Sequence, residues 1–277
     1  MQAILDFMEK AGMVRHAAGK ILTAKADGIG FLVFNQPDKL NAISVDMWDG
    51  IAQVCAAYAT DPTVRVLLMS GAGDKAFMSG GDISQFEKVR SNADANAEFQ
   101  RLTEPGRTAL SSFPKPKIAC IRGWCLGGGL AVAMRADLRI AAVDSTFGIP
   151  AARLSIAYGR DEIRRLIDLV GAANARMMLY SARRYPAREA WRMGLVNEVH
   201  ENDQLVEATF ELARTIGNNA PLSVQASKIT IDELLKDPGQ RDDALIARQT
   251  TICMNSADYA EGRRAFMEKR PPRFTGQ

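Results

Sequence analysis

Apolar and polar positions in the first part of the chain predict short strands that alternate with helices. Two apolar segments, 20–26 and 30–35, flank Asp27-Gly28, a dipeptide that favours the tight turn of a β-hairpin. Further apolar segments bounded by turn residues predict strands at 64–70, 117–122, 138–142 and 146–148. Since helical segments separate most of these strands, the pattern indicates an α/β fold.

Helical periodicity accounts for most of the remaining chain. Helices are expected at 44–60, 92–112, 161–170, 174–180, 187–193, 203–218, 221–236, 243–255 and 257–269. Apolar residues near the N-terminus favour a short amphipathic helix there. We therefore expect a helical N-terminal appendage at 1–17, a core at 18–200 and a helical C-terminal region at 201–277.

Composition and charge exclude several classes of protein. The 277 residues are 47% hydrophobic and 24% charged, as in ordinary globular chains, and the net charge of +3 is spread without a long basic block. This distribution does not favour nucleic acid, although it is compatible with an anionic ligand. The four cysteines form no C-x-x-C and the two histidines lie far apart, so neither a metal site nor a disulfide framework is expected. No segment has the length of a membrane span or the form of a secretory signal, and the cytoplasm is the expected location.

A glycine triplet, Gly127-Gly128-Gly129, separates the strand at 117–122 from an apolar helix expected to reach about Ala136. Without Cβ atoms, a ligand can approach the backbone, and the unpaired N–H groups of the first helical turn point toward it. Such a site suits a phosphate, a carboxylate or an oxyanion. The triplet alone is equally typical of close helix–strand packing.

A second glycine segment follows the strand at 64–70. It ends in Gly80-Gly81 and leads into a helix start at which Ser84 and Glu87 have the spacing of a capping box. Two glycine turns, each after a strand and before a helix, can each supply one backbone N–H. Two converging N–H donors form an oxyanion hole, so the pair of turns favours that interpretation over packing alone.

Several segments, in order along the chain, resemble the enoyl-CoA hydratase/isomerase family, also called the crotonase family. They are residues 37–42, 76–83 (Ala-Phe-Met-Ser-Gly-Gly-Asp-Ile), 115–129 (which includes the glycine triplet), 136–141, 190–197 and 266–271. The resemblance covers roughly residues 18–275. It implies a ββα-superhelix core with a helical C-terminal trimerisation region, assembled as a homotrimer or a dimer of trimers. It also implies an acyl-CoA substrate, with coenzyme A present only as part of the thioester and no separate cofactor.

The resemblance also assigns roles to individual residues. The backbone N–H groups of Gly81 and Gly128 would form the oxyanion hole that stabilises a thioester enolate. Asp82 would order the first glycine loop, and the alternative is a simple helix cap. The residues expected to bind substrate are Lys39, Leu40, Ala42, Lys75, Ala76, Asp82, Ile83, Tyr158, Phe266 and Lys269. Lys39 and Lys75 are also typical of ordinary surface lysines, and Phe266 and Lys269 match a segment that sometimes comes from a neighbouring subunit.

The two glutamates of typical hydratases are missing. The family places one two residues after the glycine triplet and the other after a proline, and these positions are Ala131 and Ala151 here. The aspartate of the family's dienoyl isomerases falls at Gly159. Alanine and glycine cannot transfer a proton, so Asp161 and Glu162, at the start of a predicted helix, are the candidate acid–base groups. Acidic residues in a first helical turn are also favoured by the helix dipole.

Two alternative functions remain at this point. Gly123-Trp-Cys-Leu-Gly127 fits the G-x-C-x-G form of a nucleophile elbow, so Cys125, with Asp161 and His200, would make a cysteine-dependent hydrolase. His200 is otherwise expected to be a surface residue. A chain without its catalytic carboxylates is also compatible with a non-catalytic acyl-CoA-binding homologue.

Overall fold

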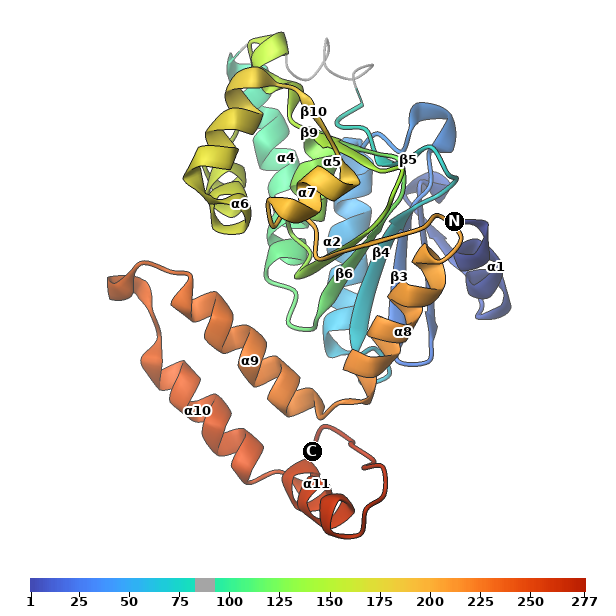
Figure 1. Cartoon of the computed structure of the whole chain (residues 1–277), viewed down its shortest axis with the longest axis vertical. Coiled ribbons are helices and arrows are strands. Elements are labelled where there is room, and N and C mark those ends of the chain that lie inside the picture. Colours follow the sequence, from blue (N-terminus) through green and yellow to red (C-terminus); the bar gives the residue numbers. More distant parts are fainter. Residues whose placement is uncertain (83–92) are drawn as a thin grey trace.

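The structure is a computed structural model, and it describes residues 1–82 and 93–277. The expected cap residues Ser84 and Glu87, and the expected substrate contact Ile83, lie outside the described residues. A seven-stranded mixed sheet forms the centre of the fold (Figure 1). Its strands, in spatial order, are β1 (Val14–His16), β2 (Ile21–Ala26), β3 (Ile29–Phe34), β4 (Val66–Gly71), β6 (Lys117–Ile121), β8 (Leu138–Ala142) and β11 (Glu198–His200).

A four-stranded sheet lies beside the large one. Its strands, in spatial order, are β10 (Arg184–Pro186), β9 (Thr146–Gly148), β7 (Trp124–Leu126) and β5 (Ala76–Met78). In each sheet the central strands run parallel, which requires crossover connections between them. These crossovers carry the two glycine segments.

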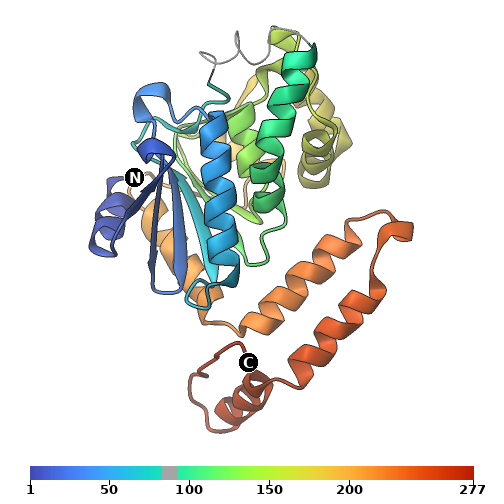
Figure 2. The ribbon, with the colours of Figure 1, turned by 180° about the vertical axis from the view of Figure 1, so that it is seen from behind.

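Helices pack around the two sheets. They are α1 (Gln2–Lys10), α2 (Val45–Thr60), α4 (Ala93–Ser111), α5 (Gly128–Ala133), α6 (Arg160–Ser181), α7 (Ala187–Arg192) and α8 (Leu205–Asn218), joined by the short 3-10 turns η1 (Ala17–Gly19), η2 (Pro37–Lys39) and η3 (Pro150–Leu154). Helices α2 and α4 lie in front of the sheet in Figure 2, and α8 covers the opposite face in Figure 1.

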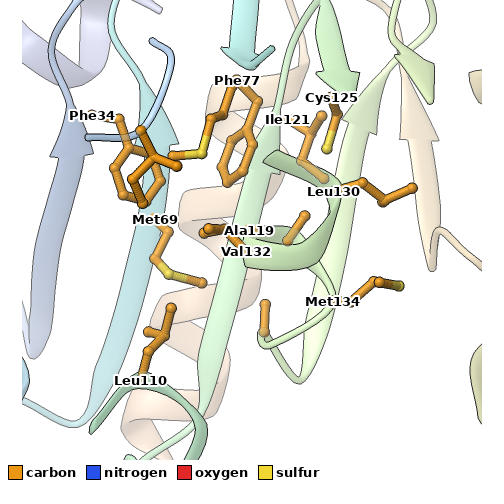
Figure 3. Packing of buried hydrophobic residues seen from close by; sticks show 14 of the residues in the cluster. Phe34, Met69, Phe77, Leu110, Ala119, Ile121, Cys125, Leu130, Val132 and Met134 are labelled. Carbon is orange, nitrogen blue, oxygen red and sulfur yellow. The ribbon is translucent and has the colours of Figure 1, made fainter. Parts of the chain in front are cut away.

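Side chains alternate along the central strands between two hydrophobic clusters. On β4, Leu67 and Met69 pack into the larger cluster with α2 and α5, whereas Val66 and Leu68 pack against α1 and α8 on the other face. Figure 3 shows part of the larger cluster, including Met69. A strand buried on both faces needs apolar residues at nearly every position, which is why these strands are continuous apolar segments in the sequence.

The last three helices project from the core. Figures 1 and 2 show α9 (Pro221–Leu234), α10 (Asp243–Met254) and α11 (Ala257–Met267) as an arm that leaves the core after α8, with η4 (Pro238–Gln240) between the first two. Because α8 packs on the sheet, the division expected at residue 200 stays a prediction. In the part of the chain that the structure describes, no helix combines the length and the apolar character needed to cross a membrane.

Two expectations about helices need correction or refinement. The helix after the glycine triplet ends at Ala133 and does not reach Ala136, because the N–H groups of Arg135 and Ala136 turn back to Val132 and Ala133. The two helices expected on either side of Gly171 form one element, α6, that is kinked there. Gly171 has φ 73° and ψ 162°, which a residue with a Cβ rarely adopts.

Candidate active site

The two glycine turns meet in space. Strand β5 pairs in parallel with β7, so the chain leaves both strands at the same edge of the small sheet. The segment after β5 continues to Gly81, and the segment after β7 continues to Gly128 at the start of α5. A Cβ atom added to Gly128 would lie 3.3 Å from the Gly81 nitrogen. The two glycines expected to form an oxyanion hole are therefore neighbours.

The residues on either side of Gly81 are hydrogen-bonded to Ile43, so the N–H of Gly81 itself points away from Ile43. Ile43 pairs with Gly81 in an isolated parallel bridge, in which Ile43 N–H donates to Gly80 O (2.8 Å) and Asp82 N–H donates to Ile43 O (3.0 Å). Since successive backbone groups in an extended segment point in opposite directions, the Gly81 N–H faces the other side, toward Gly128.

The Gly128 N–H is the first of α5, where helical N–H groups lack an intrahelical acceptor. In the described part of the chain, neither this N–H nor that of Gly81 donates to a backbone carbonyl outside its own helix or strand. Two adjacent donors are thus available to one acceptor atom, which is the arrangement of an oxyanion hole.

Other glycines allow the two turns to approach so closely. A Cβ on Gly129 would overlap the carbonyl oxygen of Met78 on β5, and a Cβ on Gly123 would overlap that of Lys75. The close packing that the sequence left as one alternative is therefore present, and ligand access stays a prediction. Gly129 and Gly123 serve packing, whereas Gly128 faces the other donor.

A loop before α2 supports the first turn. Lys39 Nζ donates to Asp82 Oδ2 at 2.8 Å, and the Asp82 side chain is buried while that of Lys39 is half-exposed. Leu40 has φ 51°, and its carbonyl accepts from the Ser79 N–H. Asp82 therefore links the first glycine turn to this loop, while its alternative role as a helix cap involves residues outside the described ones.

The remaining expected substrate contacts are divided between two regions. Ala42 and Ala76 are buried beside this loop, and Lys75 is exposed at its edge. Phe266 and Lys269 are exposed on and just after α11, at the end of the molecule opposite α5 (Figure 1). The single chain therefore does not bring these two residues to the glycine turns.

The two positions that hold glutamates in typical hydratases are close to the oxyanion turns. Ala131 follows Gly128 by one helical turn, and its side chain is 8% exposed. Ala151 lies in η3, and its carbonyl accepts from the N–H of Ile156. Neither of these two positions therefore carries a proton-transfer group beside the expected oxyanion donors.

Glu162 is the carboxylate at this site, and Arg135 holds it. Arg135 Nη2 donates to Glu162 Oε1 at 2.9 Å, and Arg135 Nη1 donates to Ala131 O at 2.8 Å. Burial raises the pKa of Glu162, but the hydrogen bond and the charge of Arg135 outweigh it, so the net pKa lies below its usual value. Glu162 is therefore ionised at neutral pH. The sequence reasoning missed Arg135, although a charged residue at the end of an apolar helix is a signal that a partner is present.

Asp161 and Tyr158 have different surroundings. Asp161, the neighbour of Glu162, is exposed on the first turn of α6. The Tyr158 hydroxyl donates to Gly127 O at 3.2 Å, and burial raises the pKa of this phenol. Tyr158 therefore fixes the carbonyl that directly precedes the Gly128 N–H.

The components of the alternative hydrolase site do not come together. Cys125 is fully buried on β7 in the hydrophobic cluster of Figure 3, and burial raises the pKa of its thiol. His200 is partly exposed on the edge strand β11, and its Nε2 lies 2.8 Å from Glu198 Oε2. In the described residues, no hydrogen bond connects Cys125 with His200 or Asp161. The geometry gives no support to a cysteine nucleophile.

The Arg135–Glu162 pair predicts a pH-dependent stability. A carboxylate whose pKa is lowered on folding stabilises the fold above its unfolded pKa, about 4.5, and this contribution is lost as the pH falls through the folded value. The wild type is expected to be more stable than Glu162→Gln at pH 7, and the difference in Tm should narrow below about pH 4.5. Thermal unfolding of both proteins from pH 7 to pH 3 measures this. A Tm difference that stays constant over this range would contradict it.

Known proteins resemble this chain over most of its length. The family described as enoyl-CoA hydratase/isomerase matches residues 24–277. Crotonyl-CoA hydratase from Syntrophomonas wolfei is 34% identical over 254 residues, which cover 92% of this chain and 97% of that protein. (E)-Benzylidenesuccinyl-CoA hydratase from Thauera aromatica is 31% identical, covering 90% of this chain and 96% of that protein.

Solved structures show the same fold. The crystal structure of an enoyl-CoA hydratase/carnithine racemase from Magnetospirillum magneticum has a TM-score of 0.89 and 32% identity, covering 93% of this chain and 96% of that one. A two-sheet α/β fold with paired glycine turns and a helical C-terminal region defines an acyl-CoA enzyme of the crotonase type. The chain belongs to the enoyl-CoA hydratase/isomerase family, as the resemblance predicted.

Proposed function

We propose that this enzyme binds an acyl-CoA thioester with its carbonyl oxygen between the N–H groups of Gly81 and Gly128. The observation that carries the proposal is the proximity of these two donors, with a Cβ position on Gly128 only 3.3 Å from the Gly81 nitrogen. Donors fixed in this way stabilise the negative charge that develops on the oxygen when the thioester becomes an enolate. Lys39 and Lys75, at the edge of the same loop, would lie beside the phosphates of coenzyme A.

Glu162 is the group that we assign to proton transfer in place of the residues missing at Ala131 and Ala151. A Cβ atom at Gly159 would overlap Glu162 Oε2, so this carboxylate fills the space that a side chain at position 159 would enter. Family members that act as dienoyl isomerases have their aspartate at that position. An ionised Glu162 would accept a proton from the substrate carbon next to the thioester, while the oxyanion hole stabilises the resulting enolate.

The expected trimer or dimer of trimers is part of this proposal. Phe266 is 83% exposed and Met267 is 81% exposed on α11, far from the glycine turns of the same chain. Assembly would cover these apolar side chains, and it would allow Phe266 and Lys269 to complete the acyl-CoA site of a neighbouring copy.

Crotonyl-CoA tests the proposal, because hydration or deconjugation removes its conjugated-enoyl absorbance. Loss of absorbance, with the product identified by mass, would establish turnover. Binding in a calorimetric titration without loss would support the second candidate, a non-catalytic acyl-CoA-binding protein, which the alanines at 131 and 151 favour. Absence of binding to crotonyl-CoA and to longer acyl-CoA esters would contradict both functions.

A further inference from the structure

A small cavity lies next to the proposed oxyanion hole. It has a volume of about 330 Å³ and is lined by Asn96, Gln100, Arg107, Ile156, Ala157, Gly159 and Glu162. Two links connect it with the site. Ile156 N–H donates to Ala151 O at 3.0 Å, and Tyr158, which follows Ala157, bonds to the carbonyl next to Gly128. The cavity is therefore placed to receive the acyl part of a thioester bound at the glycines.

The lining of this cavity is unusually polar for an acyl pocket. Four of its seven lining residues carry amide, guanidinium or carboxylate groups. Sites for hydrocarbon groups are lined mainly by apolar side chains, and the few polar groups in them contact polar groups of the ligand. A short alkyl chain would displace water from these polar side chains without offering them a hydrogen bond, which lowers affinity.

Arg107 is the residue that gives the cavity its charge. Its Nη1 donates to Gln100 Oε1, and its guanidinium carbon lies 5.7 Å from the centre of the Trp48 ring. In the part of the chain that the structure describes, no carboxylate forms an ion pair with Arg107. Burial lowers the pKa of Arg107, although the charge of Glu162 partly offsets this effect. The guanidinium is thus a half-buried cation with a neutral hydrogen-bond partner.

The neighbouring charges do not neutralise Arg107. Glu162 is the carboxylate in the cavity, and it is paired with Arg135. Glu104, on the same helix as Arg107, is exposed and bonds to the Thr108 hydroxyl. Among the described residues, Glu162 is therefore committed to Arg135 and Glu104 is solvated, so neither carboxylate forms an ion pair with Arg107.

We propose that Arg107, with the Gln100 and Asn96 amides, binds a carboxylate at the far end of the acyl group. The substrate class is then the CoA thioester of a short dicarboxylic acid. The planar guanidinium can donate two parallel hydrogen bonds to a carboxylate, and the amides can add further donors. This inference rests on the proposed function, because it places the thioester end of the ligand at Gly81 and Gly128.

Unreactive saturated esters separate binding from catalysis. Glutaryl-CoA and butyryl-CoA differ by one terminal carboxylate, and the CoA thioester of monomethyl glutarate keeps the length of glutaryl-CoA without the charge. Calorimetric titration of the full-length protein is expected to give a Kd for glutaryl-CoA about 10–100-fold lower than for butyryl-CoA. The methyl ester should bind like butyryl-CoA.

Variants at Arg107 assign the preference to this side chain. In Arg107→Met the ratio of the two Kd values should fall to about one, and Arg107→Lys should keep part of the preference, because it keeps the charge but loses the paired donors. Arg101→Met is the matched control. Arg101 is an exposed arginine on the same helix, is paired with Glu98 and lies outside the cavity, so this variant should keep the wild-type ratio.

The outcomes distinguish this inference from the proposed function. Binding of butyryl-CoA without a preference for glutaryl-CoA would overturn the inference and leave the proposed function intact, as would a preference that persists in folded Arg107→Met. If none of the esters binds, the proposed function fails, and the inference fails with it. If Arg107→Met does not fold, Arg107→Lys and the methyl ester still show whether the protein recognises the charge of the terminal carboxylate or only the length of the acyl group.

Discussion

Gly128→Ala is expected to lower kcat for an acyl-CoA substrate about 10²–10³-fold while the protein stays folded. The added methyl group would lie 3.3 Å from the Gly81 nitrogen and 3.4 Å from the Gly80 carbonyl carbon. It would occupy the space between the two N–H groups, so the thioester oxygen could no longer reach both. Steady-state rates with the CoA ester that the wild type converts, together with Tm, measure the effect.

Two other glycines provide controls for this variant. At Gly239, on the turn between α9 and α10, an added Cβ meets no atom within 4 Å, so Gly239→Ala should keep wild-type kcat and Tm. At Gly129 the added Cβ would overlap Met78 O, so Gly129→Ala should lower Tm. A folded Gly128→Ala protein with wild-type kcat would show that the thioester oxygen does not bind between these glycines.

The sequence predicted best the elements whose burial is uniform. Strands β8 and β9 lie where they were expected, and β8 is a mainly apolar segment. Of the three-residue strands, β9 was predicted, whereas β5, β7 and β10 were not, since so short a segment gives little periodic signal. These short strands matter for the site, because the pairing of β5 with β7 brings the two glycine turns together.

The end of helix α5 could not be predicted from the local pattern of apolar residues. Residues 130–136 are apolar except for Arg135, so periodicity favoured a helix as far as Ala136. The helix ends at Ala133, and beyond it Arg135 bonds both to the Ala131 carbonyl and to Glu162. Glu162 lies 27 residues further along the chain, and a contact over such a separation depends on tertiary packing.

The backbone part of the candidate site could be predicted from the sequence, whereas the side chains around its cavity could not. The pattern pointed to the two glycine turns because each follows a strand and precedes a helix, and the family resemblance then assigned Gly81 and Gly128 as the donors. Arg107 gave no comparable signal, since an arginine on an amphipathic helix is ordinarily solvated. Its position beside a cavity emerges only when α4 packs next to the start of α6.

Glu162→Gln is expected to lower kcat about 10²–10⁴-fold, the contribution typical of a well-placed acid–base group. The amide keeps the size of the side chain and can still accept a hydrogen bond from Arg135, but it cannot accept a proton from the substrate. Rates should be measured at neutral pH, where the lowered pKa of Glu162 keeps the wild-type carboxylate ionised. Binding of an unreactive acyl-CoA, measured in parallel, shows whether the loss lies in catalysis or in affinity.

Asp161→Asn is the matched control, because it changes the adjacent carboxylate on the same helical turn. Asp161 is exposed, whereas Glu162 lines the cavity beside the oxyanion hole. Both carboxylates interact with the N-terminus of the same helix, so a loss of kcat in Glu162→Gln alone would come from its position in the site. Asp161→Asn should therefore keep kcat within about twofold. A large loss in Asp161→Asn with little change in Glu162→Gln would transfer the base to Asp161. Equal and small changes in both variants would mean that proton transfer uses a group other than these two carboxylates, even though the oxyanion hole is intact.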